Sequence, residues 1–195
     1  MRDDLAAMSA AQCKQRLREL ILEKALKFGD FTLASGAKSS YYIDGRQVTL
    51  DGEGIYCLAR CLVDRLESEQ VTAVGGMALG ADPISAATAA VAASMGRKLD
   101  AFMVRKEPKS HGTGNQVEGP LESGAPVAMV EDTVTTGGST LDAIAAVERE
   151  RQAQVVLVVA MVDRQQGAAE AFARAGYRFE ALFTVEELGV TLNRN

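Results

Sequence analysis

Two carboxylates, three threonines and two glycines follow an apolar run in the second half of the chain. The run, residues 127 to 130, is short and β-branched enough to predict a buried strand. Glycines let backbone N–H groups approach an anion, hydroxyls add donors, and a helix that begins near Ser139 would add its positive dipole end. The pattern therefore predicts a phosphate-binding loop. Its members are Glu131, Asp132, Thr133, Val134, Thr135, Thr136, Gly137, Gly138 and Ser139.

The acidic pair, Glu131 and Asp132, cannot bind the phosphate, because like charges repel. Ribose hydroxyls or a divalent cation are the natural partners of carboxylates in this position, so we expect a sugar phosphate as the ligand. The competing interpretation is an ordinary strand-to-helix turn in which Ser139 caps the helix. The pattern is neither the G-x-x-x-x-G-K-[ST] loop nor the G-x-G-x-x-G turn.

A second cluster gathers cations on a glycine-bearing loop. Residues 105 to 112 read R-K-E-P-K-S-H-G and include the one histidine of the chain. A pyrophosphate group needs about this many donors, since Arg supplies a bidentate fork and Lys a point charge. A solvated surface loop is the competing interpretation. The basic members are Arg105, Lys106, Lys109 and His111.

Strands and helices alternate around these two clusters. Apolar runs predict strands at residues 71 to 74, 101 to 104, 127 to 130, 155 to 162 and 179 to 185, and 3.6-residue periodicity predicts helices at 55 to 66, 84 to 95, 139 to 151 and 168 to 175. We expect Gly75 and Gly76 to end the first of these strands. The alternation predicts one α/β domain with a mainly parallel sheet flanked by helices. Because ligands bind beyond the carboxyl ends of such strands, the two clusters and Asp163-Arg164 should converge there.

The N-terminal quarter of the chain has a different pattern. Residues 10 to 28 show helical periodicity and predict an amphipathic helix that ends near Gly29. Residues 31 to 33 and 41 to 43 bracket a turn and predict a β-hairpin or two short strands. We expect a small hood within about residues 1 to 50 and a core over about 51 to 195, together forming a single domain.

Composition excludes several classes of protein. The net charge of −5 over 195 residues disfavours nonspecific nucleic-acid binding. There is no 18-residue apolar run, and the charged N-terminus does not resemble a signal peptide, so we expect a cytoplasmic protein without a membrane partner. Three cysteines argue against a disulfide framework, and Cys57 and Cys61 are expected to be buried rather than metal ligands.

The segments R-K-E-P-K-S-H-G and E-D-T-V-T-T-G-G-S together resemble the orotate phosphoribosyltransferase family of type I phosphoribosyltransferases. The likeness extends to residues 28 to 42, F-G-D-F-T-L-A-S-G-A-K-S-S-Y-Y, and to Asp163-Arg164. The family transfers ribose 5-phosphate from phosphoribosyl pyrophosphate (PRPP) to orotate, giving orotidine 5′-phosphate and pyrophosphate in pyrimidine (UMP) biosynthesis. The resemblance implies the type I phosphoribosyltransferase fold, Mg²⁺ as cofactor, and a homodimer whose active sites are shared between subunits.

The resemblance also assigns roles to individual residues. The basic cluster would grip pyrophosphate, and Lys109 and His111 could deliver a proton to it. Glu131 and Asp132 would hold the ribose hydroxyls, with Mg²⁺ bound mainly through the substrate near this pair. Residues 135 to 139 would bind the 5′-phosphate. The expected catalytic residues are Arg105, Lys109, His111 and Asp132, and the expected orotate contacts are Thr135, Arg164, Tyr41 and Tyr42.

Three positions depart from the pattern of many family members. Ala34 and Leu79 stand where a lysine is common, which removes two basic contacts, and Glu131 replaces an Asp. Backbone amides of residues 77 to 80 could still bind pyrophosphate. The alternatives are a phosphoribosyltransferase for another base and a PRPP-sensing regulatory paralogue. The regulator should show a helix-turn-helix extension or a basic face, and the acidic net charge disfavours it.

Overall fold

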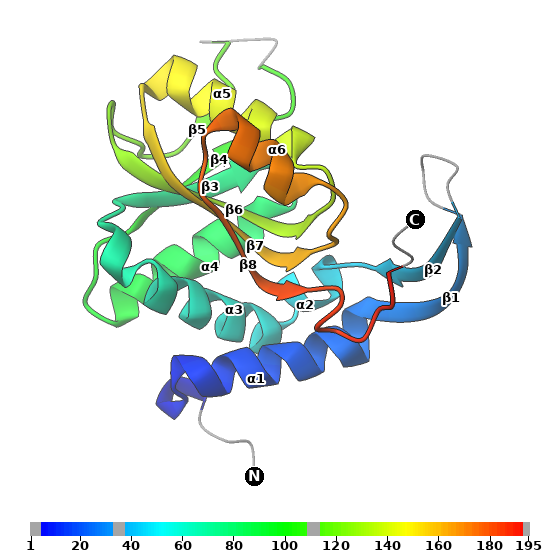
Figure 1. Ribbon diagram of the computed structural model, residues 1–195. Coiled ribbons are helices and arrows are strands. Elements are labelled where there is room, and N and C mark those ends of the chain that lie inside the picture. Colours follow the sequence, from blue (N-terminus) through cyan, green and yellow to red (C-terminus); the bar gives the residue numbers. More distant parts are fainter. Residues whose placement is uncertain (1–4, 33–37, 109–113, 193–195) are drawn as a thin grey trace.

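The computed structural model describes residues 5–32, 38–108 and 114–192 (Figure 1). Within these ranges the main sheet has six strands in the order β5-β4-β3-β6-β7-β8. All neighbouring pairs are parallel except β4 and β5. The elements are β3 (Ala73–Met77), α4 (Ala81–Ser94), β4 (Asp100–Val104), β5 (Val117–Glu118), β6 (Pro126–Val134), α5 (Gly138–Arg151), β7 (Gln154–Asp163), α6 (Ala168–Ala175) and β8 (Phe179–Thr184).

Helices cover both faces of this sheet. On one face, α4 packs with α3 (Gly52–Arg65) and α1 (Ala10–Leu20) against side chains such as Val130 and Val159. On the other face, α5 and α6 pack against the alternate side chains, such as Met129 and Val158. Because successive residues of a strand point to opposite faces, a sheet buried on both sides needs continuous apolar runs. The predicted α/β fold with a mainly parallel sheet is confirmed.

A small antiparallel sheet forms the hood beside the main sheet (Figure 1). Strands β1 (Leu26–Thr32) and β2 (Lys38–Ile43) pair in a register that places Leu26 opposite Ile43. The predicted hairpin is therefore confirmed. The helix predicted over residues 10 to 28 is wrong at its end, because α1 continues through a π-helical turn (Ile21–Ala25) and the chain is extended from Leu26. Antiparallel pairing with β2 overrides the local helical pattern there.

The predicted break at Gly75 and Gly76 is also wrong, since both lie inside β3. A Cβ at Gly75 would collide with Phe102, and one at Gly76 would collide with the Val130 carbonyl. These glycines permit close packing between neighbouring elements. Two further differences concern strands. The two-residue strand β5 lies between two predicted strands, where the sequence predicted none, and β6 extends through the acidic pair to Val134.

The remaining predictions concern cysteines and membranes. Cys57 and Cys61 are free and buried between α1 and α3, as predicted, and Cys13 lies with them. No helix among the described residues has the length and apolar character needed to cross a bilayer.

Candidate active site

The turns that follow β3, β6 and β7 meet at the carboxyl edge of the main sheet, where the hood also lies. The arrowheads of β6, β7 and β8 point toward the hood in Figure 1. Two contacts connect the parts. Arg164, after β7, bonds to Tyr41 of β2, and Gly45, at the start of α2 (Arg46–Thr49), approaches Asp132 of β6. The predicted convergence is thus present for these elements.

The acidic pair lies at the centre of this edge. Glu131 is buried and accepts a hydrogen bond from the hydroxyl of Thr140 at 3.1 Å. Asp132 accepts one from the N–H of Thr133 at 2.7 Å. A Cβ on Gly80 would lie only 3.0 Å from Glu131 Oε1 and 3.3 Å from Asp132 Oδ1. The turn after β3 therefore packs directly against both carboxylates, and only a glycine fits without displacing them.

Burial governs the protonation of this pair. It raises the pKa of Glu131 to about 8, with the nearby charge of Asp132 as the second cause. Burial also raises the pKa of Asp132. Within the described part of the chain neither carboxylate forms a salt bridge, and Arg46, whose charge acts to lower the pKa of Asp132, is paired with Asp44 at 3.0 Å. Carboxylates with perturbed pKa values in this position are typical of functional sites.

The phosphate loop follows directly. Gly137 has φ of 80° and is the N-cap residue of α5, while Thr136, Gly138 and Ser139 are exposed and Thr135 is half-buried. No side chain among the described residues caps α5, so the interpretation of Ser139 as a cap is wrong. The first N–H groups of a helix have no partner within it and are available to an anion.

Val134 and Thr133, at the start of this loop, differ in their hydrogen bonding. Val134 is buried, and its carbonyl accepts the N–H of Arg164 at 3.0 Å, which ties the loop to the end of β7. Thr133 has a buried hydroxyl for which the described residues provide no hydrogen-bond partner.

Arg164 lies between the sheet and the hood. Its Nε donates to the Tyr41 hydroxyl at 3.2 Å, and the guanidinium lies 5.0 Å from the centre of the Tyr41 ring. Its Nη2 is buried and has no hydrogen-bond partner among the described residues. Tyr41 is itself buried, whereas Tyr42 is 40% exposed and its ring contacts Phe31. Tyr41 and Arg164 thus hold the end of β7 against the hood.

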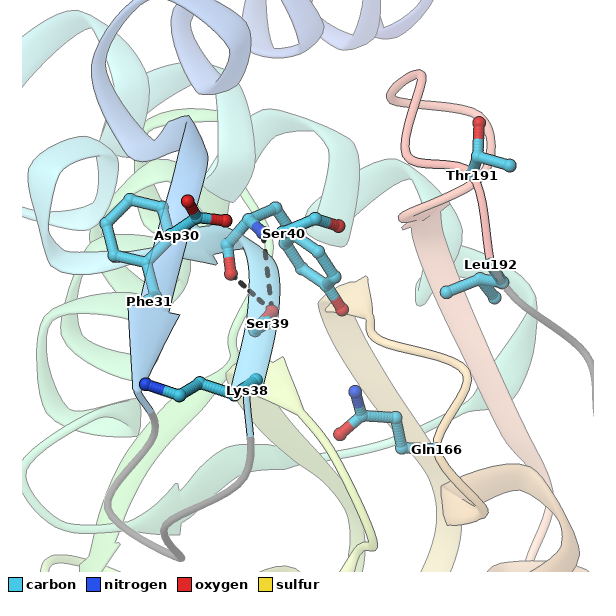
Figure 2. A pocket seen from close by; sticks show the side chains of 9 residues that line it. Asp30, Phe31, Lys38, Ser39, Ser40, Gln166, Thr191 and Leu192 are labelled. Carbon is cyan, nitrogen blue, oxygen red and sulfur yellow. Dashed lines mark hydrogen bonds between the residues drawn. The ribbon is translucent and has the colours of Figure 1, made fainter.

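A cavity of about 680 Å³ adjoins this pair, between the hairpin and the segments that follow β7 and β8 (Figure 2). Tyr41 forms part of its wall, and Figure 2 shows Gln166 facing the hairpin across the opening. Sequence reasoning missed the wall residues Ser39, Gln166, Thr191 and Leu192. Only the position of Gln166 two residues after Arg164 offered a signal for them.

The basic cluster is described only in part. Arg105 and Lys106 lie just beyond the carboxyl end of β4 and are exposed, and Arg105 forms an ion pair with Glu118 at 3.1 Å. Lys109, His111 and Ala34 lie outside the described residues. Leu79, in the turn after β3, is 83% exposed.

A metal ion would find oxygen ligands at the acidic pair. Carboxylate oxygens suit Mg²⁺, which usually takes one or two carboxylates and completes its shell with phosphate oxygens and water. The described residues contain no group of three or more His, Cys, Asp or Glu arranged to hold a metal alone. The donor set thus fits a Mg²⁺ ion held mainly through a phosphorylated ligand.

The chain is similar to known proteins over most of its length. No family model matches it. It is 45% identical over 186 residues to an orotate phosphoribosyltransferase of Nostoc sp., covering 94% of this chain and 88% of that protein. Among solved structures it is similar to the Mycobacterium tuberculosis orotate phosphoribosyltransferase in complex with Fe(III) dicitrate, with 37% identity, a TM-score of 0.80, and coverage of 91% of this chain and 99% of the other. A complex of that enzyme with PRPP gives 35% identity, a TM-score of 0.77 and the same coverage.

Proposed function

The chain belongs to the orotate phosphoribosyltransferase family, and we propose how its carboxyl-edge residues transfer ribose 5-phosphate from PRPP to orotate. The reaction yields orotidine 5′-phosphate and pyrophosphate, a step of pyrimidine biosynthesis. The observation that carries the assignment of residues is the acidic pair, with Glu131 buried and Asp132 half-buried, beside the start of α5, which has no side-chain cap. One side of this arrangement suits an anion and the other suits sugar hydroxyls.

PRPP binds with its 5′-phosphate on the loop and its ribose on the acidic pair. The exposed residues Thr136, Gly138 and Ser139, with Thr135, offer hydroxyl and N–H donors to the phosphate. Glu131 and Asp132 accept hydrogen bonds from the ribose 2′- and 3′-hydroxyls. As pyrophosphate leaves C1, positive charge develops on the sugar, and the Asp132 carboxylate stabilises that charge when it is ionised.

Orotate binds beside the hood. Its carboxylate accepts hydrogen bonds from the buried Nη2 of Arg164, while the Tyr41 hydroxyl fixes the other side of the guanidinium. Tyr42 and Thr135 bound the space for the pyrimidine ring. An arginine held in one orientation selects a base that carries a carboxylate over uracil or a purine.

The leaving group meets the basic cluster. Arg105, Lys106, Lys109 and His111 bind pyrophosphate, and Lys109 or His111 protonates one of its oxygens. A Mg²⁺ ion bound to the substrate near Glu131 and Asp132 would neutralise charge on the pyrophosphate. Leu79 leaves this end without the lysine that many relatives have, so backbone N–H groups of residues 77 to 80 take its place.

A base panel tests the reaction. With PRPP and Mg²⁺, loss of base is followed by ultraviolet absorbance for orotate, uracil and adenine. We expect consumption of orotate alone. Consumption of another base in its place would favour a different phosphoribosyltransferase, and PRPP binding without turnover of any base would favour the regulatory paralogue. Chelation of Mg²⁺ should abolish turnover, and added Mg²⁺ should restore it.

The oligomer is tested by mixing two inactive variants. We propose a cytoplasmic homodimer in which Lys109 and His111 act in the partner's site. Lys109→Ala and Asp132→Asn homodimers should each be inactive. After subunit exchange, mixed dimers would hold one site built from two intact halves, and activity should return. If exchange is demonstrated and the mixture stays inactive, the cluster acts within its own subunit.

A further inference from the structure

Gln116 forms hydrogen bonds with the backbone of Arg105 and Lys106. The N–H of Arg105 donates to the Gln116 carbonyl at 2.9 Å. In return, Gln116 Nε2 donates to the carbonyls of Arg105 at 3.1 Å and Lys106 at 3.4 Å. Gln116 thus fixes the backbone of both Arg105 and Lys106, through its own carbonyl and through its side-chain amide.

The last turn of α5 holds Gln116 in turn. The Glu150 carboxylate accepts the N–H of Gln116, at 3.0 and 3.2 Å to its two oxygens, and the N–H of Val117 at 3.0 Å. Arg149 Nη2 donates to Gln116 Oε1 at 2.7 Å. The Glu150 side chain is only 15% exposed. Charge-assisted hydrogen bonds that a carboxylate accepts from two neighbouring N–H groups are strong and directional.

These bonds matter because β5 is weak by itself. It has two residues and pairs only with the end of β4, so the sheet alone fixes the neighbouring backbone poorly. Helix α5, by contrast, begins at the phosphate loop and is 14 residues long, about 20 Å. One rigid helix therefore connects the loop expected to bind the 5′-phosphate with the backbone of the cations expected to bind pyrophosphate.

We propose that Gln116 and Glu150 are positioning residues, which orient Arg105 and Lys106 toward the pyrophosphate end of PRPP. The proposal rests on the proposed function, since it assumes that these two cations contact pyrophosphate. Neither Gln116 nor Glu150 touches the substrate. Their loss should therefore weaken interactions with PRPP, and the KM for orotate should not change, because Arg164 lies at the end of a different strand.

The experiment measures kcat and both KM values for three substitutions. Gln116→Ala removes the bonds to both carbonyls and should lower kcat/KM for PRPP about tenfold, the effect of a small misplacement of charged groups. Glu150→Ala should act in the same direction. Glu148→Ala is the matched control, because Glu148 lies on the same helix but accepts its bond from Tyr177 at 2.9 Å. It should leave PRPP kinetics unchanged.

Testing Gln116→Ala in a protein that already lacks both cations distinguishes a positioning role from a general loss of structure. If Gln116 acts through the two cations, Gln116→Ala should have no further effect in a protein that already carries Arg105→Ala and Lys106→Ala. The same tenfold loss in that background would overturn the proposal. If Gln116→Ala does not fold, Gln116→Glu removes the same N–H donors at constant volume and should give the same pattern.

The controls also distinguish failure of this proposal from failure of the function beneath it. A wild-type protein that does not consume orotate contradicts the proposed function. An active wild type with unchanged PRPP kinetics in the Arg105→Ala, Lys106→Ala protein contradicts the pyrophosphate role of these cations, and with it the positioning role. If the Arg105→Ala, Lys106→Ala protein has altered PRPP kinetics but Gln116→Ala does not, only the positioning role is contradicted.

Discussion

Charged side chains at the amino edge of the main sheet, where the parallel strands begin, are paired differently from those at the carboxyl edge, where the strands end. At the amino edge, where β8 begins, Arg65 donates to Glu180 at 2.6 Å and to Glu69 at 2.8 Å. Arg178 donates to Glu69 at 2.8 and 3.0 Å. The hydrogen bonds from Arg178 and Arg65 lower the pKa of Glu69 to about 2. Each of these four charged side chains has its partner within the folded chain.

At the carboxyl edge, Glu131, Asp132 and Arg164 form no salt bridge with any described residue. Burial raises the pKa of Glu131 to about 8, and one amino group of Arg164 is buried without a hydrogen-bond partner among the described residues. Such groups are unfavourable in a protein that only needs to be stable. The comparison indicates that these amino-edge groups serve stability, and it supports our proposal that PRPP and orotate complete the carboxyl edge.

The sharpest test of this difference replaces one carboxylate at each edge by its amide. Asp132→Asn should lower kcat about 100- to 1000-fold, because it removes the negative charge that faces the developing cation on the ribose. Glu180→Gln makes the same change at the amino edge and should leave kcat unaltered. Steady-state kinetics with orotate and PRPP test this prediction. If Asp132→Asn is fully active, the acidic pair has a structural role only.

A second matched pair concerns the arginines. Arg164→Ala should raise the KM for orotate about 10- to 100-fold, the usual contribution of hydrogen bonds to a charged group. Arg164→Lys keeps the charge without the fork and should fall between Arg164→Ala and the wild type. Arg178→Ala should leave the KM for orotate unchanged. Equal KM values in all four proteins would show that orotate does not meet Arg164.

The pH dependence of stability should distinguish the edges without any substrate. The pKa of Glu131 is raised in the folded protein to about 8, so the folded state binds this proton more tightly than the unfolded state. The free energy of unfolding should therefore fall as pH rises from about 5 to about 8. Glu131→Gln cannot titrate and should be more stable than the wild type at pH 8, by about 1 to 3 kcal/mol. Urea unfolding across this range checks the prediction, and parallel curves for the two proteins would contradict it.

The smallest effect is expected at Glu69. Its pKa is lowered in the folded protein, so its contribution is present above the ordinary carboxylate pKa and is lost as pH falls toward about 2. Glu69→Gln should slightly lower the melting temperature at neutral pH, because solvent screens its ion pair with the exposed Arg178. Turnover should be unchanged. A large loss of activity would mean that the amino edge communicates with the site.

Local patterns predicted the parts of the site that local residues build. The apolar run, acidic pair, hydroxyls and glycines of the phosphate loop lie within 13 consecutive residues, so their order alone indicated a strand, a loop and a helix. The alternation of strands and helices similarly predicted the parallel sheet.

Contacts between distant residues explain what the sequence did not reveal. Gly75 and Gly76 are required by Phe102 and Val130, and a glycine pair gives no sign of which neighbour it accommodates. The extended chain at Leu26 depends on Ile43 across the hairpin. The hydrogen bond from the Gln116 N–H to the Glu150 carboxylate joins residues that have no recognisable pattern in common.

The most direct test of the contrast between the edges combines both substitutions at each edge and measures two properties together. Turnover of orotate with PRPP and urea unfolding of the ligand-free protein are compared for Asp132→Asn with Arg164→Ala and for Glu180→Gln with Arg178→Ala. The account predicts that the carboxyl-edge protein loses turnover while keeping or gaining stability, and that the amino-edge protein loses stability while keeping turnover. If turnover and stability fall together in both proteins, the division between the edges is wrong.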